Sequence, residues 1–329
     1  MVSNNSRIPV TMVAGWHGSG KSAFVERLTD LIGTRTCAVV ASAPNETGDG
    51  RCLLQVEDEV VEQVPGCRFC AVRHDLVYSL RSLCLGVNQP ARILVELSGW
   101  ADPAVAAQTL LGDPYLAQTV ELDALVTVVD ASALYVRARG NRDPWPAQSM
   151  GDQVALADIV LVNRTQELTA TAGRLVQTLI AGTNPLARIV ENHNGLDLSQ
   201  FFDLHGYRPA SSTRVSGLDP APSTAIEGAV SGLVVELTGR LDRARFEHWA
   251  ASLDHDEAAR ILRIVGPIYV AGDKYPLLCH RVGTHLALER TDRWSVGLPG
   301  ATRLFVSGRG LTREMVLDGL QDCLTTQQC

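Results

Sequence analysis

The sequence predicts an α/β fold, in which a parallel sheet with helices on both faces is followed by a small C-terminal α+β domain. Three observations support this prediction. A motif of the form G-x-x-x-x-G-K-[ST] occupies Gly15–Ser22, short apolar runs alternate with helical patterns up to residue 192, and a second group of strand patterns with two helices follows residue 232. Strands that alternate with helices are typical of a parallel sheet covered on both faces.

The glycine-rich motif lies between an expected strand and an expected helix. Ile8–Ala14 is short and mostly apolar, and apolar residues recur at helical spacing after the motif. Glycines let backbone N–H groups approach phosphate oxygens, and the helix N-terminus adds its positive dipole end. This strand–loop–helix context is that of a P-loop, so we expect nucleotide binding rather than an incidental turn. Lys21 would reach the β- and γ-phosphates, and the Ser22 hydroxyl would bind Mg²⁺. The expected nucleotide-binding residues of the loop are Gly15, Gly18, Ser19, Gly20, Lys21, Ser22 and Ala23.

Acidic residues follow two further strand patterns. Cys37–Ser42 leads into a polar loop that contains Glu46, and Ile93–Val95 leads directly into Glu96. Loops at the carboxyl ends of parallel strands face the bound ligand, so Glu46 is a candidate ligand of Mg²⁺ or another metal, with a solvated loop acid as the alternative. Glu96 has the Walker-B arrangement, which holds Mg²⁺ directly or through water. Gly99 would let the following backbone swing toward a γ-phosphate.

Two cysteines form a possible site for a soft metal ion. Cys67 and Cys70 have C-x-x-C spacing, and thiolates are favoured ligands of Zn²⁺. His74 lies four residues beyond Cys70 and would share a helical face with it. Because a single C-x-x-C is a weak signal, buried free cysteines and a redox pair remain alternatives.

Two more strand patterns, Leu125–Val129 and Ile159–Val162, complete the expected parallel sheet. Between them we expect an exposed loop over Arg137–Ser149 and a short helix over Gln153–Ala157. The second strand ends in the polar run Asn163-Arg164-Thr165-Gln166.

The composition changes between His193 and Gly232, where Gly, Ser, Pro and Asp dominate, and this change indicates a linker. We therefore expect a P-loop domain over residues 1–192, a linker over 193–232 and an α+β domain over 233–329. In the last part the expected strands are Leu233–Leu237, Ile261–Val270, Leu277–His285 and Arg303–Val306, and the expected helices follow Asp242 and span Leu311–Leu324.

Charge and hydropathy exclude several classes of protein. The chain has 29 Lys and Arg against 36 Asp and Glu, a net charge of -7, and it has no basic run, so nucleic acid is not an expected partner. It has no apolar stretch of about 18 residues, and Met1–Arg7 is polar and lacks the apolar region of a signal peptide, so we expect neither a membrane span nor a secretory signal. Cysteines spread through a chain of this kind indicate a reducing, cytoplasmic location.

Taken together, these motifs resemble those of the CobW family of P-loop GTPases, metallochaperones and metalloenzyme-maturation factors, over nearly the whole chain. The segments that carry the resemblance are the P-loop, Asn45-Glu46-Thr47-Gly48, Gly66-Cys67-Arg68-Phe69-Cys70-Ala71-Val72-Arg73, Glu96-Leu97-Ser98-Gly99-Trp100-Ala101-Asp102-Pro103, Val126–Asp130, Asn163-Arg164-Thr165 and Asn184-Pro185-Leu186-Ala187.

The resemblance implies slow GTP hydrolysis with Mg²⁺, and a transition metal such as Zn²⁺ or Co²⁺ that is delivered to a client metalloprotein. It implies Lys21 and Glu96 as the catalytic residues. The implied Mg²⁺ ligands are Ser22, Glu46 and Glu96; the implied further nucleotide contacts are Ser98, Gly99, Asn163, Arg164 and Gln166; and the implied transition-metal ligands are Cys67 and Cys70 with Glu46 and His74.

Three departures from the family pattern bear on these expectations. Phe69 replaces a middle thiol, which lowers the expected affinity for a soft metal or recruits Glu46 or His74. Gln166 replaces the Asp of the guanine-reading motif Asn-Lys-x-Asp, and losing a charged acceptor costs about 1.5–3 kcal/mol. ATP therefore remains an alternative to GTP, and Glu167 is a possible substitute acceptor. The expected linker has few histidines, which argues against bulk metal storage there.

Three functions fit the sequence. The first is a nucleotide-switched metallochaperone, whose loops are ordered by the γ-phosphate and Mg²⁺. The second is a metalloenzyme-maturation or activator NTPase of the nitrile-hydratase-activator type, with a weak metal site or none. The third is a small-molecule kinase, against which the Asn163 motif and the C-terminal domain argue.

Overall fold

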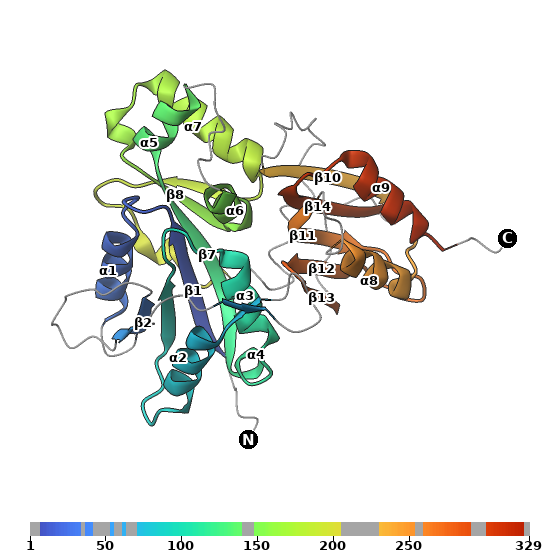
Figure 1. Cartoon of the computed structure of the whole chain (residues 1–329), viewed down its shortest axis with the longest axis horizontal. Helices are drawn as coiled ribbons and strands as arrows, with labels where there is room; N and C mark the ends of the chain where they lie inside the picture. The colour runs from blue at the N-terminus through green and yellow to red at the C-terminus, as the bar shows by residue number, and fades with distance from the viewer. Residues whose placement is uncertain are drawn as a thin grey trace.

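A computed structural model of the chain describes residues 7–33, 37–41, 53–55, 61–63, 71–139, 148–204, 230–253, 259–290 and 301–325 (Figure 1). For residues 38–41, 53–55, 61–63, 71–74, 148 and 149 it describes the backbone alone. None of the helices in these ranges is both long enough and apolar enough to cross a lipid bilayer.

The first domain is built on a sheet of seven described strands, all parallel, in the order β3-β2-β6-β1-β7-β8-β9. Its central strands are buried on both faces, which is why they read as continuous apolar runs in the sequence. The strands are β1 (Ile8–Gly15), β2 (Cys37–Ala41), β3 (Leu53–Gln55), β6 (Arg92–Glu96), β7 (Val120–Asp130), β8 (Ile159–Asn163) and β9 (Arg188–Glu191).

Helices cover both faces of this sheet. On one face Phe24 and Leu28 of α1 pack with Phe201 of the 3₁₀-helix η2, and on the other face the apolar sides of α2, α3, α6 and α7 form a larger cluster. The helices are α1 (Lys21–Ile32), α2 (His74–Leu85), α3 (Pro103–Gly112), α4 (Leu116–Thr119), α5 (Ala131–Ala138), α6 (Gln148–Leu156), α7 (Ala170–Thr183), η1 (Thr165–Glu167) and η2 (Leu198–Phe201). A separate antiparallel hairpin pairs β4 (Val61–Gln63) with β5 (Ala71–Arg73). The α/β fold class predicted from the sequence is confirmed.

The structure corrects two sequence predictions in this domain. The exposed loop predicted over Arg137–Ser149 is wrong at both ends, because α5 continues to Ala138 and α6 begins at Gln148, five residues before the predicted helix. In addition, η2 lies inside the predicted linker and its Phe201 is fully buried. At least this part of residues 193–232 is therefore folded against the first domain.

The second domain is a five-stranded antiparallel sheet, in the order β10-β14-β11-β12-β13, with two helices on one face. The first helix begins after Asp242 as predicted, whereas the second begins at Arg313, two residues after the predicted Leu311. Asp242 and Thr312 each cap their helix by accepting a hydrogen bond from a backbone N–H of the first turn. The elements are β10 (Val230–Thr238), α8 (Arg243–Ser252), β11 (Arg260–Ile268), β12 (Leu277–Val282), β13 (His285–Arg290), β14 (Ala301–Arg309) and α9 (Arg313–Asp322). The single strand predicted over Leu277–His285 is a hairpin, whose turn contains Gly283 at a φ of 52°.

The face of this sheet opposite α8 and α9 packs on the first domain (Figure 1). Val230, Leu262 and Val282 of the sheet belong to the same apolar cluster as α3 and α6. A buried ion pair lies at the same interface: Arg263 of β11 is 3.0 Å from Asp158 and also donates a hydrogen bond to the Leu156 carbonyl. Because the two domains share a core, the second sheet is fixed relative to the first domain.

Asp152 of α6 is fully buried at this interface and lies 3.0 Å from Arg260 and 2.9 Å from Arg309. Burial raises the pKa of Asp152 from 3.8 to about 6, although Arg309 and Arg260 act to lower it and Asp102 adds to the rise. The folded protein therefore takes up a proton at Asp152 at a higher pH than the unfolded chain does.

This shift predicts a pH dependence of stability that the Asp152→Asn variant lacks. Because the folded state binds more protons here between pH 7 and pH 5, the contribution of Asp152 to the free energy of unfolding increases as the pH falls, by about 1 kcal/mol over this range. Denaturant unfolding of both proteins at pH 7 and pH 5 measures it. The free energy of unfolding of the wild type minus that of D152N is expected to be larger at pH 5 than at pH 7. A difference that is the same or smaller at pH 5 would contradict the prediction.

Candidate functional site

The P-loop connects the end of β1 to the start of α1 and has the backbone shape that phosphate binding requires. Gly18 and Gly20 have φ angles of 77° and 98°, in the left-handed region that favours glycine. A Cβ on Gly20 would lie 2.5 Å from Asn163 Nδ2, so a larger residue would have to displace the Asn163 side chain as well as strain the backbone. The hydroxyl of Ser19 is buried and has no hydrogen-bond partner among the described residues. A phosphate oxygen would provide that partner, so the loop fits the predicted ligand.

Lys21 begins α1 and is largely buried. Its Nζ donates to the Trp16 carbonyl at 3.1 Å, which holds the ammonium group over the loop. Burial lowers the pKa of Lys21, and the nearby Glu96 carboxylate opposes this shift. The electrostatic attraction between an ammonium group and a phosphate is stronger when the ammonium group is removed from water in this way than when it is exposed.

Ser22 and Glu96, which the sequence predicted as Mg²⁺ ligands, lie together at the mouth of the loop. The Ser22 hydroxyl donates to Glu96 Oε1 at 2.6 Å. β6 pairs with β1 so that Glu96 lies opposite Val13, and this register brings a carboxylate to the start of α1. A hydroxyl and a carboxylate are oxygen donors of the kind that Mg²⁺ prefers, so the pair fits that ion.

Ser98–Asp102, here called the 98–102 segment, follows β6 and lies against the P-loop. A Cβ on Gly99 would lie 2.7 Å from the His17 backbone nitrogen, so the close approach of the two backbones requires glycine. The Trp16 and Trp100 rings meet edge to face with their centroids 4.2 Å apart.

A cavity of about 930 Å³ opens beside the loop, between α1 and η1. Its wall includes the predicted nucleotide contacts Ser19, Gly20, Ala23, Asn163, Arg164 and Gln166. Glu167, the possible substitute acceptor, does not contribute to this wall, whereas the carboxylate-bearing Glu191 does. Gln177 donates to Glu191 Oε1 at 2.9 Å and so orients that carboxylate.

Amide side chains tie the cavity to the P-loop. Asn163 Nδ2 donates to the Ser19 carbonyl at 2.6 Å, Asn192 Nδ2 donates to Asn163 Oδ1 at 2.6 Å, and Arg27 donates to Asn192 Oδ1 at 2.8 Å. Arg164, which also lines the cavity, forms an ion pair with Asp130 and has a left-handed backbone with a φ of 59°. Sequence reasoning identified Asn163 but not Asn192, whose only signal is its place directly after β9.

Gln153 was also missed as a site residue. It is fully buried in α6, and its Nε2 donates to the carbonyls of Gly99 and Ala101 at 3.2 and 3.1 Å. It therefore fixes the path of the 98–102 segment from the side opposite the P-loop.

The predicted transition-metal ligands Glu46, Cys67 and Cys70 lie outside the described residues, and for His74 only the backbone is described, as the first residue of α2. Among the described residues, three or more His, Cys, Asp or Glu side chains nowhere gather closely enough to hold a metal ion. The structure does place β5, which directly follows Cys70, beside α3.

Comparison with known proteins places the chain in a family. The model described as "CobW/HypB/UreG, nucleotide-binding domain" matches residues 9–191. The chain belongs to the CobW/HypB/UreG family. A second model, the cobalamin synthesis protein CobW C-terminal domain, matches residues 230–324.

Relatives of this CobW-family chain cover nearly its full length. It is 27% identical to the zinc chaperone CobW of Pseudomonas aeruginosa, over 97% of this chain and 92% of that protein. It is 25% identical to the zinc chaperone YjiA of Escherichia coli, over 91% and 93% of the two chains. The crystal structure of the zinc-bound YjiA GTPase has the same fold, with a TM-score of 0.68 and 21% identity over 97% of this chain and 100% of that one.

Proposed function

We propose that this protein is a GTP-hydrolysing metallochaperone that binds zinc and delivers it to a client metalloprotein. The observation that carries the proposal is the pairing of Ser22 with Glu96 at the mouth of a P-loop, in a chain whose full-length relatives are named zinc chaperones. The site geometry supports nucleotide chemistry, and the relatives support the metal.

In the proposed reaction the P-loop amides and Lys21 bind the β- and γ-phosphates and stabilise the charge that develops on them. Mg²⁺, when bound at Ser22 and Glu96, with Glu46 as a further proposed ligand, would neutralise phosphate charge as a Lewis acid. Gly99, whose backbone lies against His17 of the loop, is the proposed backbone N–H donor to the γ-phosphate. We name no side chain as a general base, because positioning and electrostatics supply most of the rate in this class of reaction.

Guanine preference is the finer part of the proposal. Guanine presents N–H donors at N1 and N2, whereas adenine presents an acceptor at N1. The acceptors in the cavity wall include the Gln166 amide oxygen and the Glu191 carboxylate. Gln166 stands where the family motif has an Asp, which lowers the binding free energy for guanine. The anionic acceptor Glu191 would restore part of that binding free energy, so we expect GTP to bind more tightly than ATP.

The fold supports a connection between nucleotide and metal. The 98–102 segment leads directly into α3, and α3 lies beside β5, which begins one residue after Cys70. A change in the segment on γ-phosphate loss would reach the chain next to the proposed zinc ligands through one helix. This arrangement fits metal release that depends on hydrolysis.

Zinc titration tests the metal assignment. The Cys67→Ser/Cys70→Ser double variant is expected to bind Zn²⁺ at least about tenfold more weakly than the wild type, because serine oxygens are poor substitutes for thiolates. Competition with a chromogenic zinc indicator measures both affinities, and Cys84→Ser, which alters a buried free cysteine of α2, is the matched control. Equal, weak zinc binding by wild type and double variant would favour the maturation-factor alternative instead.

A further inference from the structure

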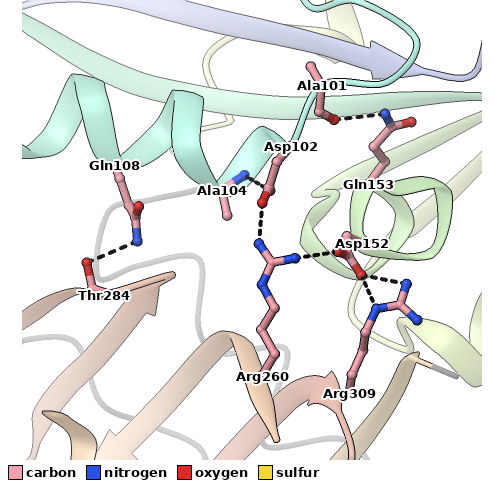
Figure 2. Close-up of polar contacts among 9 residues, drawn as sticks. All are labelled: Ala101, Asp102, Ala104, Gln108, Asp152, Gln153, Arg260, Thr284 and Arg309. Atoms are coloured by element: carbon pink, nitrogen blue, oxygen red, sulfur yellow. Dashed lines mark hydrogen bonds and ion pairs between the residues drawn. The ribbon is translucent and has the colours of Figure 1, made fainter. Parts of the chain in front are cut away.

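Among the described residues, an arginine of the C-terminal domain forms an ion pair with the 98–102 segment. Arg260, at the start of β11, reaches across the domain interface, forms an ion pair with Asp102 and lies 3.0 Å from Asp152 (Figure 2). Arg309 of β14 also pairs with Asp152 but has no contact with Asp102 in Figure 2. Arg260 is therefore the arginine that joins the second sheet to the segment beside the P-loop.

Asp102 lies where the segment becomes a helix. Its Oδ1 accepts a hydrogen bond from the Ala104 N–H at 2.9 Å, which caps α3, while its Oδ2 faces Arg260. Three residues earlier, the Gly99 carbonyl is held by Gln153, the neighbour of Asp152 in α6. Adjacent α6 residues thus bind the arginines of the second domain and the backbone of the segment.

At its other end, the 98–102 segment contacts the P-loop itself. Gly99 lies against the backbone of His17, and Trp100 contacts Trp16. A continuous set of contacts therefore runs from the phosphate-binding loop through the segment to Asp102, and from Asp102 to Arg260 of the C-terminal sheet.

We propose that Arg260 is a positioning residue, with which the C-terminal domain holds the 98–102 segment ready for a nucleoside triphosphate. The proposal rests on the nucleotide-binding function proposed above. A segment already fixed at Asp102 loses less conformational freedom when a γ-phosphate orders Gly99, so the ion pair strengthens triphosphate binding. A nucleoside diphosphate has no γ-phosphate to order the segment, so the ion pair does not change its binding affinity. By linkage, a bound triphosphate in turn strengthens the contact between the domains.

Arg260→Gln in the full-length protein tests this inference. We expect the affinity for a non-hydrolysable GTP analogue to fall at least fivefold, the lower end of measured couplings between sites, with the affinity for GDP unchanged. Calorimetry with both nucleotides in the presence of Mg²⁺ gives the two values. Arg309→Gln is the matched control, because it removes an arginine from the same Asp152 carboxylate but leaves the pair between Arg260 and Asp102 in place. We expect R309Q to keep the wild-type ratio of the affinity for the GTP analogue to the affinity for GDP.

Asp102→Asn provides a second, independent variant. Asparagine still caps a helix but lacks the charge that pairs with Arg260, so D102N is expected to show the same loss for the triphosphate alone. Three results would overturn the inference. They are an unchanged affinity of R260Q for the GTP analogue, an equal loss of affinity of R260Q for the analogue and for GDP, and a change in the ratio of these two affinities that is as large in R309Q as in R260Q. A wild-type protein that binds neither nucleotide would refute the proposed function instead, so the two failures are distinguishable.

Discussion

Lys21→Ala is expected to weaken nucleotide binding by at least about 100-fold and to leave the protein folded. The loss follows from removing an ammonium group that forms charge-assisted hydrogen bonds to phosphate, worth about 1.5–3 kcal/mol each. Folding is expected to survive because alanine is a strong helix former at the start of α1, and because, among the described residues, the change removes a single side-chain hydrogen bond, to the Trp16 carbonyl.

Calorimetric titration with a GTP analogue measures the loss, and circular dichroism checks the fold. The control is Lys274→Ala, which removes the other lysine of the chain, an exposed residue of the second domain. Nucleotide affinity retained in K21A would contradict the assignment of Lys21 and of the P-loop.

Glu96→Gln is expected to lower the rate of GTP hydrolysis at least about 100-fold while changing nucleotide affinity much less. Glutamine keeps the size of the side chain and an oxygen that can accept the Ser22 hydroxyl, now at 2.6 Å from Glu96. It lacks the negative charge that would hold Mg²⁺ next to the phosphates, and that charge stabilisation contributes several kcal/mol to the transition state.

Phosphate release under single-turnover conditions, at saturating Mg²⁺, measures the effect on the chemical step. Glu236→Gln is a suitable control, because Glu236 is half-exposed on β10 and far from the loop in the sequence and the fold. Hydrolysis by E96Q at the wild-type rate would show that the Ser22–Glu96 pair is not the metal site.

The sequence was sufficient to predict the parts of the site whose residues belong to recognisable motifs. The P-loop motif and the apolar run before Glu96 together predicted that Ser22 and Glu96 would lie close to each other, because the carboxyl ends of parallel strands share one edge of a sheet. The structure brings these two residues together, while their roles in metal binding stay predictions.

Contacts of residues that belong to no motif were not predictable. Gln153 and Asn192 are polar residues without motif spacing, and they reach the site only because α6 and β9 lie next to it. β9 itself, Arg188–Glu191, has charged residues at both of its ends, so its pattern does not indicate a strand. The ion pair between Arg260 and Asp102 joins two domains, and one chain's sequence contains no signal for such a partner.

Two boundary errors have local causes. The hairpin of Leu277–Val282 with His285–Arg290 was missed because a mostly apolar run leads up to Gly283, and a single glycine in a strand pattern also indicates a bulge. The polar, proline-bearing composition of Arg137–Ser149 indicated a loop, but the first two and the last two residues of that range lie in α5 and α6.

The central claim is that a purine triphosphate at the start of α1 controls a zinc site in the same protein. Titrating the purified chain with GTP and with ATP, each with and without one equivalent of Zn²⁺, tests it most directly. The account predicts GTP binding that is tighter than ATP binding and that changes at least about fivefold when zinc is present. The absence of binding by either triphosphate, or a GTP affinity that zinc leaves unchanged, would contradict it.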